Sequence, residues 1–399
     1  MSYKLLNVRY SLVTIGSMLL ASATFGFAYN FLSQSGFDDA TTGTTISLIS
    51  LLGVFVGPFV ADIVDRSSKL TQKMFIAASM VVCAAFCALL LVVPAGAFLI
   101  LPVVVIAFMS ASVGVPLLNG MAFIYEKAGG VINYGLCRGL GSAAFAVGSA
   151  VLGRLWAAMG RTSLPVWCIV SAVFTLVAVM LMPDAPKDMA GNNKHENVEK
   201  PISIFQFFSR YKDVTLVVLA LVLMYFCHYL IQTYMAKIIG TFATSDVEGI
   251  QGTALFIQAM SELPSMFGFS LLMRKFGVPK IIVAASVFFT VKHAIVLFTS
   301  NAFMLYGAMA LQMVSFAAIF TGTVYLANDY VGEADRNKGQ AVFAASGAVG
   351  MLLSSFLGGW LFQFLEVRPV LVVGVVVSTC GTLLMVYGIR RLTAGAKGQ

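Results

Sequence analysis

Three ionisable side chains stand near the middle of two long apolar segments, where a charge is costly unless it is paired or functional. Glu262 lies in the first segment, and Lys292 and His293 lie in the second. A short basic turn from Arg274 to Lys280 joins the two segments. At ~1.5 Å per residue, Glu262 and Lys292 both stand roughly 17 Å from this turn. The acid and the base can therefore lie at the same depth.

This pairing points to binding and proton transfer rather than covalent catalysis. An ionised carboxylate accepts hydrogen bonds from solute hydroxyls, and a histidine such as His293 titrates near neutral pH. Gln258 precedes Glu262 by four residues, so both side chains face the same way on a helix. The structural alternative is an ion pair between Glu262 and Lys292 that simply joins the two segments.

The composition is that of a polytopic membrane protein. Hydrophobic residues make up 59% of the 399, charged residues 11%, and the mean hydropathy is +0.91. An ordinary soluble domain has about 25% charged residues. The net charge of +8 is read as membrane orientation rather than nucleic-acid binding. Neither a nucleotide-binding loop nor an HExxH or Cys/His cluster is present, so we expect no cofactor, no metal and no enzymatic activity.

Twelve segments are apolar over the ~20 residues that a membrane-crossing helix needs. They are expected at residues 8–32, 41–64, 72–93, 96–120, 132–158, 163–183, 212–238, 250–273, 281–299, 302–327, 339–363 and 369–390. The predicted fold is an all-α polytopic membrane protein with twelve transmembrane helices in two pseudo-symmetric six-helix bundles.

The two bundles are expected at residues 1–183 and 212–399, with a charged, solvated linker at 184–211. A shift of 204 residues places Gly135 on Gly339 and Trp156 on Trp360, as expected for two repeats. Lysine and arginine gather in the loops on one side. The positive-inside rule then puts both termini and the linker in the cytoplasm. We expect the chain to lie in the cytoplasmic (inner) membrane, in contact with the lipid bilayer.

The loop between the second and third segments resembles the G-x-L-a-D-r-x-G-r-k signature of the major facilitator superfamily. Asp62 stands at the aspartate of the motif and Arg66 in its basic part, whereas Pro58 and Asp65 replace its glycines. The resemblance implies a major facilitator fold that works by alternating access as a single chain. It also implies a cytoplasmic gate that includes Asp62 and Arg66.

More specifically, the chain resembles the lactose-permease-like branch of oligosaccharide, nucleoside and phenylpropionate proton symporters. Arg138 matches the arginine that grips the sugar, and Phe145 falls where the permease has a stacking tryptophan. Glu262 matches its sugar-binding glutamate, and Lys292 replaces a buried arginine. The gripping carboxylate is unmatched, and Asn119 is the nearest polar candidate by position.

The tenth segment departs from the permease at its proton-coupling residues. Where the permease has lysine, histidine and glutamate, this chain has Met309, Gln312 and Ser315, which do not ordinarily titrate. A proton-coupled protein of this sequence would have to use other groups, and Glu262 and His293 are the candidates. Gln312 remains a hydrogen-bonding candidate for the solute.

These residues favour a secondary active transporter, with proton-coupled uptake of a small polar solute such as a sugar or oligosaccharide. The first alternative is an importer of an aromatic acid or nucleoside, in which Lys292 and Arg138 would grip a carboxylate. A drug efflux antiporter is disfavoured, because no proline lies between Gly139 and Gly153. A solute sensor that no longer transports is the third alternative, since the tenth segment lacks proton-coupling residues.

Replacing Glu262 by Gln is expected to abolish solute binding or proton coupling, because an amide holds neither a negative charge nor an exchangeable acidic proton. The measurement is solute accumulation driven by a pH gradient in membrane vesicles. Full accumulation by the Glu262→Gln variant would contradict this role.

Overall fold

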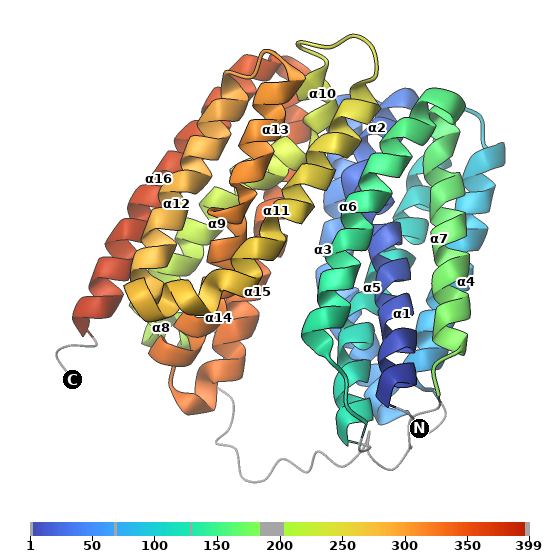
Figure 1. The fold of residues 1–399 in the computed structure, drawn as a ribbon. Helices are drawn as coiled ribbons and strands as arrows, with labels where there is room; N and C mark the ends of the chain where they lie inside the picture. The colour runs from blue at the N-terminus through green and yellow to red at the C-terminus, as the bar shows by residue number, and fades with distance from the viewer. Residues whose placement is uncertain (1–2, 68–69, 128–129, 184–202, 396–399) are drawn as a thin grey trace. The chain divides into compact units, whose positions relative to one another are not determined.

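The computed structural model describes residues 3–67, 70–127, 130–183 and 203–395, and this part of the chain is helical almost throughout (Figure 1). The first helices are α1 (Tyr3–Gly26), α2 (Ala28–Gln34), α3 (Asp39–Arg66), α4 (Gln72–Val92), α5 (Ile100–Lys127), α6 (Tyr134–Met159) and α7 (Ser163–Met180). They are followed by α8 (Ile204–Arg210), α9 (Lys212–Thr233), α10 (Met235–Ile239), α11 (Val247–Phe276), α12 (Val278–Leu297), α13 (Ala302–Ala310), α14 (Phe316–Tyr330), α15 (Arg336–Phe364) and α16 (Val367–Gly395).

Ten helical stretches in the described residues are long and apolar enough to cross a membrane, or eleven when the bent α11 is included. One of the ten, Tyr134–Met180, is 47 residues long and contains both α6 and α7. At ~1.5 Å per residue it would measure about 70 Å, more than twice the hydrocarbon core of a bilayer. A 3-10 turn at Gly160–Thr162 separates its two helices. The stretch therefore supplies two crossings, and the predicted twelve-helix fold is confirmed.

The helices form two compact units (Figure 1). The first contains α1 to α7 together with the segment Ser245–Ala259, which includes the first turns of α11. The second contains α8 to α10, the rest of α11 and α12 to α16. Most of the predicted linker lies outside the described residues, so the boundaries at 183 and 212 stay a prediction. The sequence did not indicate that α11 is divided between the units.

Each unit repeats the same packing scheme. In the first unit α1 packs on α6 and α7, and α4 packs on α5 and α7. In the second unit α9 packs on α15 and α16, and α12 packs on α14 and α16. Each unit also has its own hydrophobic core, one around Tyr10 and Leu117 and the other around Leu221 and Phe289. Two repeats of six spans account for this correspondence.

Four of the predicted spans are interrupted. The first breaks at Phe27 between α1 and α2, and the seventh breaks at Tyr234 between α9 and α10. The eighth, α11, bends by 56° between Val247–Ser265 and Gly268–Phe276. Pro264 lies just before this bend, and a proline inside a helix removes a backbone hydrogen bond. The tenth is divided into α13 and α14 by a 3-10 turn, Leu311–Met313.

The first turns of α11 pack against α6 backbone to backbone within the first unit. A Cβ atom on Gly153 would lie 2.3 Å from the carbonyl oxygen of Glu248, and a Cβ atom on Gly252 would lie 2.4 Å from that of Ser149. Any side chain at either glycine would have to push the two helices apart. The glycines thus permit an approach that no other residue allows.

Polar side chains hold the same contact from the side of α2. Gln34 Nε2 donates to Glu248 Oε1 at 2.7 Å, and Asn30 Nδ2 donates to Gln251 Oε1 at 2.9 Å. Trp156 Nε1 in turn donates to Gln34 Oε1 at 2.9 Å. Gln251 and Asn30 are buried, so these hydrogen bonds replace contacts with water that the side chains lose.

The Gly153→Ala variant is expected to lower the free energy of unfolding by about 1–3 kcal/mol, because the added methyl group meets backbone that cannot rotate away. Gly139→Ala in the same helix is the matched control, since a Cβ atom there meets nothing within 4 Å. The control should be neutral or slightly stabilised. Thermal unfolding of the detergent-purified variants measures both. A Gly153→Ala protein as stable as the control would contradict the close contact.

Candidate functional site

The predicted acid and base are linked in the second unit through an amide from a third span. Lys292 Nζ donates a hydrogen bond to Gln312 Oε1, and Gln312 Nε2 donates to Glu262 Oε1 at 3.0 Å. Lys292 is only 1% exposed and Gln312 is fully buried, whereas Glu262 is half-buried. The structure therefore brings three of the sequence-predicted residues together and makes Glu262 the most accessible of them.

Gln312 owes its position to the interruption of the tenth span. It lies in the 3-10 turn between α13 and α14, where the chain has neither proline nor glycine. A short 3-10 stretch within a longer helix often marks a functional hinge. Interrupted helices are also the usual builders of binding sites in membrane transporters. The sequence carried no local signal for this break.

His228 of α9 completes the cluster around Lys292. Its Nδ1 lies 3.4 Å from Lys292 Nζ, and its ring stacks on Phe316 with the centroids 4.8 Å apart. His293 is fully buried one position after Lys292, with its ring centroid 6.5 Å from that of His228. From its type alone His228 can be recognised as a histidine able to titrate near neutral pH, but its sequence position does not reveal that it lies next to Lys292.

A ladder of hydroxyl groups continues from His293 between α12 and α16. His293 Nδ1 lies 2.9 Å from Ser378 Oγ, which in turn lies 3.0 Å from Thr290 Oγ1. Thr290 Oγ1 is also 2.8 Å from Thr382 Oγ1. The i,i+3 spacing of Thr290 and His293 and the i,i+4 spacing of Ser378 and Thr382 place each pair on one helix face. Sequence reasoning did not identify Thr290, Ser378 or Thr382 as functional residues.

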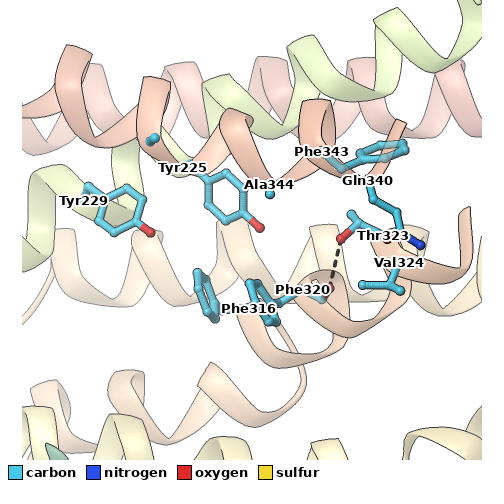
Figure 2. A pocket seen from close by; sticks show the side chains of 11 residues that line it. Tyr225, Tyr229, Phe316, Phe320, Thr323, Val324, Gln340, Phe343 and Ala344 are labelled. Atoms are coloured by element: carbon cyan, nitrogen blue, oxygen red, sulfur yellow. Dashed lines mark hydrogen bonds between the residues drawn. The ribbon is translucent and has the colours of Figure 1, made fainter. Parts of the chain in front are cut away.

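An aromatic cavity of about 180 Å³ lies beside this cluster, within the second unit. Figure 2 shows the rings of Tyr225 and Tyr229, from α9, opposite Phe316 and Phe320 of α14. The rest of the wall comes from α14 and α15 and includes Thr323, Val324, Gln340, Phe343, Ala344, Gly347 and Ala348. Two tyrosine hydroxyls, a threonine hydroxyl and an amide are the polar groups on an otherwise apolar, largely aromatic surface.

Phe316 connects the cavity to the buried base. Its ring stacks on His228, lies 5.7 Å from the ring of Tyr225 and is parallel to Phe320 at 6.0 Å. The cavity and the cluster therefore share walls. Aromatic residues four apart on one helix are typical of a helix face, but among 32 phenylalanines they could not be singled out.

The remaining predicted binding residues belong to the first unit or to the divided helix. Arg138 is exposed near the start of α6, with Nη1 3.6 Å from Met18 Sδ. Asn119 is exposed on α5 and accepts a hydrogen bond from the Tyr134 hydroxyl at 3.3 Å.

Phe145 is half-buried on α6. Gln258 is buried one turn before Glu262, on the part of α11 that packs in the first unit.

The predicted gate is described only in part. Asp62 is exposed near the end of α3, and the side chain of Arg66 lies outside the described residues. Within the described part of the chain, no three His, Cys, Asp or Glu side chains are grouped so that they could hold a metal ion.

Comparisons with known proteins give a family and a fold. The model of the family described as "MFS_1 like family" matches residues 19–373. A crystal structure of the nucleoside transporter NupG superposes with a TM-score of 0.81 at 14% identity, covering 97% of this chain and 99% of that chain. A bacterial homologue of the iron transporter ferroportin superposes with a TM-score of 0.70 at 12% identity, covering 98% and 100%. A bacterial homologue of the lysosomal transporter Spinster gives 0.69 at 12% identity, covering 98% of each chain. No curated protein matches the sequence.

Replacing Gln312 by Leu is expected to cost about 2–4 kcal/mol of stability, because Glu262 loses a donor and Lys292 loses an acceptor in a buried setting. Gln232→Leu, a half-buried glutamine of α9, is the control and should cost under 1 kcal/mol. Denaturation in mild detergent measures both. Equal stability of the two variants would contradict the bridging role of Gln312.

Proposed function

This chain belongs to the MFS_1 like family of membrane transporters, and on that premise we propose that it imports, by alternating access, a small polar solute that carries one planar ring system. A nucleoside or an aromatic acid fits this description best. The observation that supports the solute class is the aromatic cavity beside the Glu262–Gln312–Lys292 cluster.

The size and lining of the cavity favour one planar ring. Sites for drug-sized ligands usually enclose ~300–1,000 Å³. About 180 Å³ accommodates a nucleobase or a phenyl ring, whereas an oligosaccharide would exceed it. Facing aromatic side chains stabilise such a ring by offset or edge-to-face stacking. A sugar unit also packs on aromatic rings, so a monosaccharide is the second candidate and an oligosaccharide is disfavoured.

Different members of the cluster suit different tasks. Glu262 is half-buried, so we assign it the hydrogen bonds to solute hydroxyl or amide groups, with Gln258 one turn away on the same helix. Lys292 is closed off by His228 and Gln312, which argues against a direct grip on a solute carboxylate in this state. Arg138, Phe145 and Asn119 are the candidate solute contacts of the first unit.

Proton coupling, orientation and assembly complete the proposal. The buried bases of α9 and α12 support coupling to protons. The distribution of lysine and arginine supports a cytoplasmic membrane location with both termini in the cytoplasm. Two repeats within one chain supply a complete transporter fold, so a single chain is the proposed functional unit.

Counterflow in proteoliposomes tests the solute class, with uridine, phenylpropionate, glucose and lactose as probes. We expect exchange of uridine or phenylpropionate and none of lactose. Exchange of lactose alone would overturn the proposal that the solute carries one planar ring system. Binding without exchange would identify a sensor, and outward pumping of apolar drugs would identify an efflux protein.

Phe316→Ala should reduce the apparent affinity for the exchanged probe about tenfold, because a lost stacking contact of about 1.4 kcal/mol corresponds to that factor. Phe303→Ala is the matched control, since Phe303 is 85% exposed at the start of α13 in the same unit. Its exchange should equal that of the wild type. Equal affinities for both variants would show that the aromatic cavity does not bind the solute.

A further inference from the structure

We propose that His228 and Lys292 share one exchangeable proton and form the proton-binding site of the second unit. The assignment of this proton to transport rests on the proposed function, whereas the shared site itself does not. At the positions of the tenth span where the permease that the sequence resembles has titrating residues, this chain has Met309, Gln312 and Ser315.

The geometry limits the pair to one positive charge. Lys292 Nζ and His228 Nδ1 are 3.4 Å apart, and the two residues are 1% and 3% exposed. Two positive charges at this separation away from water would repel each other strongly. Either the Lys292 ammonium donates to a neutral His228, or a protonated His228 donates to the neutral Lys292 amine. The same proton lies between two nitrogens in both forms.

The groups around the pair favour a net single charge. The titratable side chains that face it are Glu262 of α11, reached through Gln312, His293 of α12, and Cys227 and Tyr229 of α9. Glu262 is the one carboxylate among them and balances one positive charge. A second proton would go to the Glu262 carboxylate or to His293, whose Nε2 is buried without a partner among the described residues.

Gln312 couples the protonation of the His228–Lys292 pair to Glu262, the residue proposed to bind the solute. Its amide accepts from Lys292 and donates to Glu262, so it contacts both the base and the carboxylate. A hydrogen bond from an ammonium is stronger than one from a neutral amine. Moving the proton to His228 therefore weakens the hold of Lys292 on Gln312. Because Gln312 lies in the 3-10 turn between α13 and α14, the weaker hydrogen bond loosens the point at which the tenth span is broken.

Histidine NMR on the full-length protein in lipid nanodiscs tests the shared proton without any solute. The chain has only three histidines, so 15N-histidine labelling gives three pairs of ring-nitrogen signals, and His228→Asn assigns one pair. Replacing Lys292 by Met removes the nitrogen with which His228 shares its proton, so the pH at which the His228 ring signals change should move by about one unit or more. Lys237→Met, a lysine of α10 in the same unit, is the control and should leave the His228 titration unchanged.

Lys292→Arg provides a second variant in case the Met variant does not fold. Arginine keeps its charge at all accessible pH values, so His228 should remain neutral across the range in which the wild type titrates. A His228 titration that is the same in wild type and in whichever Lys292 variant folds would overturn the shared site. If the site is confirmed but no probe is exchanged, the proposed function fails alone.

Discussion

A lysine buried among membrane-spanning helices governs the arrangement of the second unit. Its ammonium cannot reach water, so other helices must supply its partners. Gln312 approaches from the interrupted tenth span and His228 from α9, and the Gln312 amide passes the interaction on to Glu262 of α11. Four separate spans therefore converge on one side chain.

Two of the four interruptions lie where function is expected. The bend of α11 follows Pro264, close to Glu262, and the turn between α13 and α14 contains Gln312. Regular helices satisfy their own backbone groups and leave few polar atoms for a solute. Interruptions place polar atoms inside the unit and supply hinges at the same positions. The aromatic cavity adds a surface on which a ring can bind (Figure 2).

The sequence predicted what depends on composition and missed what depends on contacts between helices. Long apolar segments predict twelve spans, because the thickness of the bilayer sets their length. Glu262 and Lys292 stand out because a charged side chain inside a membrane has a high free-energy cost. The break at Gln312 has no local cause in proline or glycine, so only its tertiary partners explain it. The cavity residues could not be separated from other aromatics, and the division of α11 between the units depends on packing alone.

The contact between Gly153 and Gly252 has a consequence for how this protein can change over time. Where the two glycines meet, backbone lies against backbone, so a side chain at either position would collide with the opposing helix. The geometry of this contact can be altered only by moving whole helices, a step that point mutations rarely achieve. These two positions should accept a single residue type, while the lipid-facing residues around them vary freely.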